Sequence, residues 1–136
     1  MNRPRIICLM IALFTIGLFG CTDDSEKIIV TTYQPEEVEA HYAKIGGKIT
    51  SIKAETELWD YGICWGETPN PDLSGDNYSR AWNDVPYHPV YTTPIDFEWM
   101  LVGLNPETEY HIRMFAAKDQ NTVIYGEDRK FTTKKE

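Results

Sequence analysis

The sequence predicts an all-β protein that folds as a single antiparallel β-sandwich of about seven strands. Apolar and polar residues alternate with a period of two in several segments, which is the pattern of half-buried strands. No segment keeps a helical apolar period of 3.6 residues for as long as about ten residues. Short strands separated by turns rich in Gly, Pro and Asn are typical of an antiparallel sandwich.

The first twenty residues are set apart from this domain. Arg3 and Arg5 form a basic head, and the fourteen residues 6–19 carry no charge. An apolar run of this length is too short to span a bilayer comfortably as a helix. Together with the basic head it predicts a secretory signal peptide over residues 1–20.

The apolar run ends in Leu18-Phe19-Gly20-Cys21, which resembles a bacterial lipobox, with a small residue before the cleavage point and a cysteine after it. The resemblance implies that Cys21 is lipidated and that several acyl chains hold the protein permanently on a membrane. Residues 21–27 would then be the lipidated cysteine and a polar tether. The alternative is an ordinary signal peptide followed by an incidental cysteine.

The tether continues with Asp23 and Asp24. This pair either resembles the acidic tag that sends lipoproteins to the cell surface in some Gram-negative bacteria, or forms a solvated linker. We therefore expect an outer membrane lipoprotein that faces the cell surface or the periplasm.

Charge and cysteine content exclude several classes of partner and site. Loss of residues 1–20 removes two arginines and no acid, so the formal net charge goes from −8 to −10. Phosphate backbones repel such a domain, and we expect no nucleic acid partner. Cys8 leaves with the signal peptide and Cys64 alone belongs to the domain, so neither a disulfide framework nor a cysteine-based metal site is expected.

Six segments in residues 28–133 carry strand patterns. Residues 28–33 are rich in β-branched residues and stop before a proline, and residues 94–101 alternate with Ile95, Phe97, Trp99 and Leu101 facing inward. Bulges are expected at Gly46-Gly47 and at Tyr125-Gly126, where glycine tolerates unusual backbone angles. The predicted strands are 28–33, with a possible continuation at 38–41, then 43–51, 59–66, 94–101, 110–117 and 123–133.

The strand that begins at Tyr110 follows a turn started by Pro106, and Leu104 precedes that turn. A tyrosine at the head of a strand after such a turn predicts a tyrosine corner, in which the ring joins the core and the hydroxyl reaches back to the turn backbone. His111 on the same strand is expected to point outward.

The pattern Leu-x-Pro-x-Thr-x-Tyr-x-Ile-x-Met-x-Ala over residues 104–116 resembles the corner and following strand of fibronectin type III domains, a variety of immunoglobulin-like sandwich. Phe131-Thr132-Thr133 resembles the end of the last strand of these domains. Residues 61–65 resemble a divergent version found in surface lipoproteins of Bacteroidota-type bacteria. The resemblance covers residues 28–133 and implies a fold, with no ligand.

The sequence differs most from a β-sandwich with short connections at an insert, residues 67–93. It is longer than an ordinary sandwich connection and rich in Pro, Asn, Asp and aromatic residues. Aromatic rings stack on the C–H face of a sugar, and carboxylates and amides bind its hydroxyls. The insert therefore predicts a glycan site. Its candidate residues are Trp82, Asn83, Asp84, Tyr78 and Tyr87, together with Trp59 outside the insert.

Two other uses of these rings stay open, because they also pack a loop onto a sheet or dock another protein. An envelope protein is therefore the alternative partner to a polysaccharide. Catalysis is not expected, since the three histidines form no paired motif and no serine has a nucleophile context. Asp72, Asp76 and Asp84 fit no calcium loop spacing, so we expect no metal and no cofactor.

Overall fold

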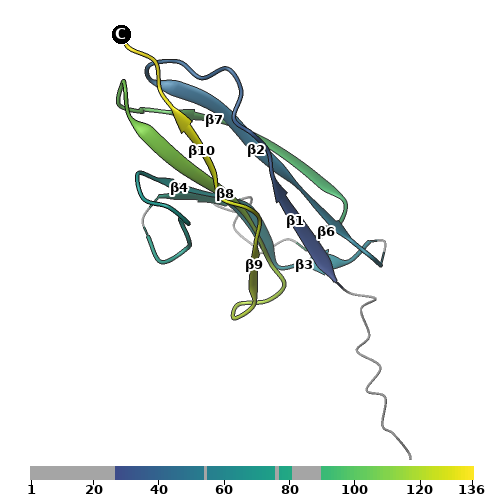
Figure 1. Ribbon diagram of the computed structural model, residues 1–136. Helices are drawn as coiled ribbons and strands as arrows, with labels where there is room; N and C mark the ends of the chain where they lie inside the picture. The colour runs from purple at the N-terminus through teal and green to yellow at the C-terminus, as the bar shows by residue number, and fades with distance from the viewer. Residues whose placement is uncertain (1–26, 54, 76, 81–89) are drawn as a thin grey trace, which may run out of the picture.

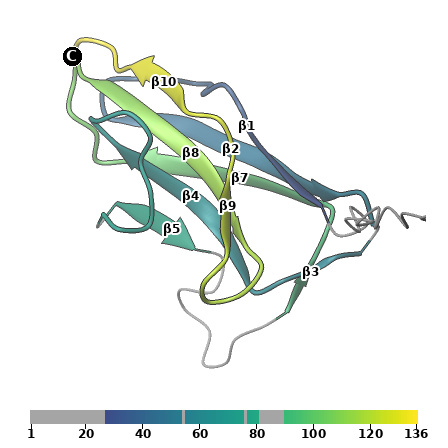
Figure 2. The same cartoon turned by 60° about the horizontal axis from the view of Figure 1, so that its bottom comes forward.

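The computed structural model describes residues 27–53, 55–75, 77–80 and 90–136, which form an antiparallel β-sandwich without helices (Figures 1 and 2). One sheet has the order β1-β2-β7. The other has the order β10-β8-β4-β5, with β9 also paired to β8, and β3 pairs with β6 in a small ribbon. The strands are β1 (Ile28–Thr32), β2 (Tyr42–Ser51), β3 (Glu57–Leu58), β4 (Asp60–Gly66), β5 (Tyr78–Arg80), β6 (Tyr91–Thr92), β7 (Ile95–Val102), β8 (Glu109–Ala117), β9 (Val123–Tyr125) and β10 (Arg129–Thr132).

The predicted fold class is confirmed, although the described chain divides into ten strands instead of about seven. The core lies between the two larger sheets and follows the alternation of the sequence. On β8, Ile112 and Met114 are completely buried. Burial of a side chain of this size contributes about 1.5–3 kcal/mol, so these alternating positions determine which face of β8 meets the core.

The expected inward face of β7 is only partly correct. Leu101 is buried, whereas Trp99 remains 45% exposed. The physical reason is that β7 is the outermost strand of its sheet, and β5, at the corresponding edge of the other sheet, has only three residues. An inward-facing side chain at that edge has little opposite it.

An extra residue interrupts the last predicted strand. Tyr125 pairs with Phe115, and Arg129 pairs with Ile112, so four steps along one strand match three along the other. This bulge lies where Tyr125-Gly126 predicted it, and it separates β9 from β10. It also redirects Glu127, whose carboxylate accepts a hydrogen bond of 3.2 Å from the Thr32 N–H.

The bulge predicted at Gly46-Gly47 is wrong, because the pairing of β2 with β7 runs through both glycines without a break. Glycine is required there by close approach: a Cβ on Gly46 would overlap the carbonyl oxygen of Phe97. The bulge lies instead in the segment that follows β1 and pairs with the other side of β2. There the Tyr33 N–H donates to the Gly46 carbonyl and the Glu36 N–H donates to the Lys44 carbonyl, so three residue steps in this segment match two steps on β2.

The turn before β8 has the geometry of a tyrosine corner. Tyr110 is buried, and its hydroxyl accepts a hydrogen bond of 3.0 Å from the backbone N–H of Asn105. Its ring stacks on Phe131 with centroids 5.8 Å apart. Leu104 is buried beside it, and the carbonyl of Pro106 accepts a bond of 2.9 Å from the Thr108 hydroxyl.

Candidate functional site

The insert expected at residues 67–93 contains a short strand near its middle. That strand is β5, which pairs with β4 at the edge of the five-stranded sheet. The candidate residues Trp82, Asn83, Asp84 and Tyr87 lie outside the described residues.

The other two candidate rings do not share one site. Tyr78 is half-buried on β5 opposite Cys64, near the end of β4. Trp59 is half-buried just before β4, where its N–H donates to the Ala117 carbonyl at 2.9 Å. The five residue steps from Trp59 to Cys64 span roughly 17 Å of extended chain, so these rings lie toward opposite ends of β4.

A polar hollow of about 370 Å³ lies within the first part of the insert, beyond the end of β4. Figure 2 shows this segment at the end of the sandwich away from the N-terminus of β1. Trp65 is half-buried, and the side chains of Asn70, Asp72 and Asn77 are exposed. The hollow is lined by Trp65, Gly66, Glu67, Thr68, Asn70, Pro71, Asp72, Ser74, Gly75 and Asn77.

Hydrogen bonds to distant parts of the chain hold the loop that forms this hollow, which we call the 67–77 loop. The Asn70 N–H donates to the Asp128 carboxylate at 3.0 Å, and the Leu73 N–H donates to the Tyr125 hydroxyl at 3.2 Å. Near the end of β4, the Trp65 N–H donates to the Asn77 carbonyl at 3.0 Å. A loop fixed at three points loses less conformational freedom when it binds a ligand.

Asp72 keeps its negative charge in the hollow. The Ser74 hydroxyl and the Ser74 N–H both donate to its carboxylate, and these bonds lower the pKa of Asp72. A carboxylate that is held ionised is a strong hydrogen-bond acceptor. Beside it lie two exposed asparagines, whose amides both donate and accept.

His111 contradicts its prediction, because it is buried. The 67–77 loop and the chain around residue 128 cover the outer side of β8, where His111 and Arg113 project. His111 Nδ1 lies 2.9 Å from Asp128, and Arg113 stacks on the Tyr125 ring at 4.4 Å. These contacts position the two side chains that hold the loop.

Sequence reasoning missed Asp128 and Tyr125 because each bonds residues more than fifty positions away. The only local signal was the expected bulge at Tyr125-Gly126, which turns the chain so that Asp128 faces β8. Nothing in the sequence distinguishes Trp65 from the other residues of the strand predicted at 59–66.

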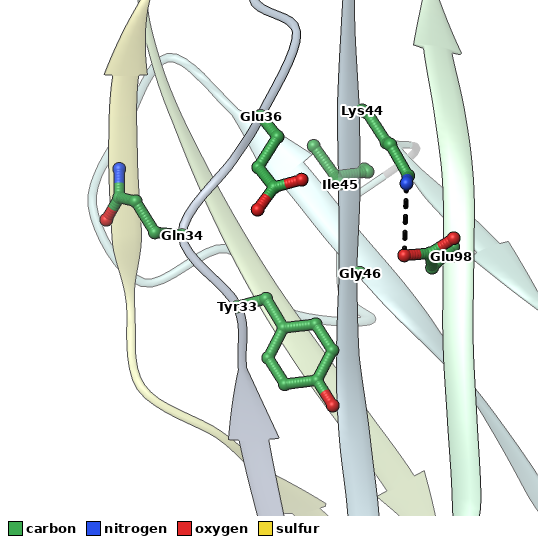
Figure 3. A pocket seen from close by; sticks show the side chains of 7 residues that line it. All are labelled: Tyr33, Gln34, Glu36, Lys44, Ile45, Gly46 and Glu98. Atoms are coloured by element: carbon green, nitrogen blue, oxygen red, sulfur yellow. Dashed lines mark ion pairs between the residues drawn. The ribbon is translucent and has the colours of Figure 1, made fainter.

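A second hollow of about 350 Å³ lies on the outer side of the three-stranded sheet. Figure 3 shows Lys44 and Glu98 of this hollow directed toward one another. Lys44 Nζ pairs with Glu98 at 3.1 Å, and the Tyr33 hydroxyl donates to Asp96 at 3.1 Å. Since these groups have partners, this hollow offers a ligand less than the 67–77 loop does.

Among the described residues there is neither a metal-binding cluster nor a membrane-spanning helix. Within them, no three His, Cys, Asp or Glu side chains gather closely enough to hold a metal ion. Of the acids considered for calcium, Asp76 and Asp84 lie outside the described residues. Nor does the described part of the chain contain a helix with the length and apolar character needed to cross a membrane.

Comparison with models of known protein families finds no match, and comparison with curated proteins finds none either. Among solved structures, the fold is similar to the sensor domain of the anti-sigma factor RsgI4 from Pseudobacteroides cellulosolvens. Its short form has a TM-score of 0.53 at 15% identity, covering 79% of this chain and 94% of that one. Its solution structure has a TM-score of 0.52 at 14% identity, with 79% and 75% covered. At these identities the likeness shows a shared β-rich fold.

Proposed function

We propose that the protein is a non-catalytic lipoprotein of the cell envelope, whose fibronectin type III-like domain binds glycans in the hollow of the 67–77 loop. The observation that carries the proposal is the grouping of Trp65, Asn70, Asp72 and Asn77 around one hollow. Residues 28–133 form the binding domain, and its ligand contacts come from the insert at 67–93 together with Trp65 just before it.

The chemistry of the hollow suits a sugar. An indole ring presents an apolar face to the C–H groups of a pyranose and keeps an N–H for a polar contact. The ionised Asp72 accepts hydrogen bonds from hydroxyls, and the asparagine amides bind hydroxyls in either sense. The hydrogen bonds from Asn70 and Leu73 to the sandwich hold these groups in place before the ligand arrives.

The similar structures support a recognition role, since both are described as sensor domains. In the present protein we propose the same broad use of the fold, with the signal or ligand bound outside the core. The ligand class follows from the 67–77 loop alone.

An envelope location fits the placement of the hollow. β1 begins beside the end of β2, where Ile28 pairs with Ser51, and the tether would enter there. The 67–77 loop follows the far end of β4, which is seven residues or about 20 Å long. A lipid on Cys21 would thus hold the domain with its hollow directed away from the membrane.

The anchor has its own test. Cys21→Ala is expected to move the protein from the membrane fraction to the soluble fraction of fractionated cells, because the acyl chains would have no attachment point. The matched control is Cys64→Ala, which should leave membrane association unchanged. Continued membrane association of the Cys21→Ala protein would contradict the anchor.

The glycan site is tested by tryptophan fluorescence. The mature chain carrying Cys21→Ala is titrated with a panel of plant, host and bacterial polysaccharides, and a saturable change is expected. Trp65→Ala should weaken binding by about 30-fold, the effect of a central aromatic anchor. Trp59→Ala, at the other end of β4, should bind normally.

Because Trp65 also packs on the core, its replacement affects stability as well as binding, and a second pair of variants separates the two effects. Asn70→Ala and Asp72→Asn change exposed side chains and should weaken binding without lowering the melting temperature. Loss of binding in Trp82→Ala alone would move the site to the second part of the insert. No fluorescence change with any polysaccharide of the panel would contradict glycan binding.

An interaction with an envelope protein is the second candidate function, and one observation favours it. Tyr42, Met100 and Val102 are exposed together at one end of the outer face of the three-stranded sheet. Tyr42 and Val102 are direct cross-strand neighbours. Crosslinking on cells, followed by identification of a partner lost in Tyr42→Ser, would support a subunit role.

A further inference from the structure

A second binding feature is the free edge of β7. This strand pairs with β2 along its whole length, from Ile95 opposite Ile49 to Val102 opposite Tyr42. No other strand among the described residues pairs with it. Eight residues in regular register therefore form the outer edge of the three-stranded sheet.

The backbone pattern shows which groups face outward. Lys44 exchanges bonds of 2.8 and 2.9 Å with Glu36 and thus points its backbone away from β7. Its neighbours Ala43 and Ile45 consequently bond β7, because backbone direction alternates along an antiparallel strand. The residues of β7 whose N–H and C=O groups face away from β2 are Asp96, Glu98, Met100 and Val102.

The edge has few of the devices that keep strands from pairing. Residues 95–102 contain no lysine and no proline, and their register has no bulge. The edge of the opposite sheet, β5, has only three residues and is protected by its shortness. The charged residues of β7 are the acids Asp96 and Glu98, which disfavour an acidic strand and favour a basic one. An edge strand of eight residues with no neighbour on its outer side among the described residues is a template for such a further strand.

The side chains along β7 define what that strand should contain. On the inner side, the half-exposed Trp99 stacks on Phe97 with centroids 6.4 Å apart, which leaves an apolar surface at the open flank of the sandwich. On the outer side, Asp96 accepts a hydrogen bond of 3.1 Å from the Tyr33 hydroxyl and Glu98 pairs with Lys44 at 3.1 Å, and both carboxylates remain exposed to a further basic group. Figure 3 shows Glu98 on this strand, beside Lys44.

We propose that the edge of β7 binds an extended peptide segment of another protein, in which apolar and basic residues alternate. The segment adds antiparallel to β7, its apolar side chains cover Trp99, and its basic side chains lie beside Asp96 and Glu98. A second copy of this chain fits poorly, because each copy has a formal net charge of −8 and brings acids to the same edge. The inference is independent of the glycan site.

The probe is a fluorescent peptide of alternating lysine and valine, seven residues long, followed by anisotropy at physiological ionic strength. In antiparallel pairing, the backbone N–H groups of its lysines face β7 and those of its valines face away. Saturable binding is expected to fall about tenfold or more when the lysine N–H groups are methylated. Methylation of the valine N–H groups is expected to preserve binding. Equal binding of the two methylated peptides, or no binding of the parent, would overturn the proposal.

Protein variants locate the site. Met100→Pro removes an outward N–H at an edge position, where proline is tolerated, and is expected to abolish peptide binding with the melting temperature nearly kept. Trp99→Ala is expected to weaken binding even if Met100→Pro fails to fold. Asn70→Ala should bind the peptide normally, which separates this edge from the glycan site. Unchanged binding in the folded Met100→Pro protein would also overturn the proposal.

Discussion

Replacing Gly62 with alanine is expected to lower the free energy of unfolding by about 3 kcal/mol or more, at the upper end of the range for overpacking. Gly62 lies in the middle of β4, between Arg80 of β5 and Phe115 of β8. A Cβ there would overlap the carbonyl oxygen of Ser79 and come within 2.9 Å of Phe115 Cε1. Backbone on one side and a fully buried ring on the other leave little room for adjustment. Urea denaturation measures the change.

The same strand supplies the matched control. A Cβ on Gly66 meets no atom within 4 Å, so Gly66→Ala should leave stability unchanged or raise it by up to about 1 kcal/mol through the unfolded state. If both substitutions lowered the free energy of unfolding equally, the close packing of β4 against β5 and β8 would not be the cause of the destabilisation at Gly62.

Tyr110→Phe is expected to destabilise the domain by about 1–3 kcal/mol. The substitution keeps the ring that stacks on Phe131 and removes only the hydroxyl oxygen that accepts from the Asn105 N–H. That N–H would be left without its acceptor in a partly buried turn. The unfolding midpoint should therefore fall while the slope with denaturant stays constant.

Tyr42→Phe provides the comparison for this effect. Tyr42 is 41% exposed on the outer face of β2, and loss of its hydroxyl should change stability by less than about 0.5 kcal/mol. If the Tyr110 and Tyr42 substitutions had the same effect, the hydroxyl of Tyr110 would have no special part in stabilising the turn.

The parts of the fold that the sequence predicted well are those governed by local alternation. Every second residue of β8 from Tyr110 to Ala116 is buried, as a period of two predicts, and the predicted bulge lies next to Gly126, where a Cβ would come within 2.6 Å of the Thr32 hydroxyl oxygen. Phe115 and Ala117, on the other face of β8, are buried as well.

Burial that depends on what lies opposite was predicted less well. Trp99 faces inward, as the alternation predicts, but it lies at a sheet edge and stays exposed. His111 faces outward by the same alternation, but a loop covers it and it is buried.

The candidate site shows the same division. Composition identified the insert at 67–93 as the place for aromatic and polar contacts, and the 67–77 loop belongs to it. Composition alone favoured Trp82 with its neighbours, since they are adjacent in sequence. The hollow is also lined by Trp65, which precedes the insert, and its loop is held by Asp128, which accepts a hydrogen bond from Asn70 although the two lie 58 positions apart in the sequence. Contacts between residues so far apart depend on the completed sandwich.

Binding of a ligand at the 67–77 loop can be located by mapping backbone amide chemical shifts. The isotope-labelled mature chain with Cys21→Ala is titrated with the polysaccharide that gives the strongest fluorescence change. Progressive shifts are expected only in residues 65–77 and in the supporting residues Tyr125 and Asp128. Shifts centred on residues 81–89 or on β7, with none in the 67–77 loop, would contradict this site.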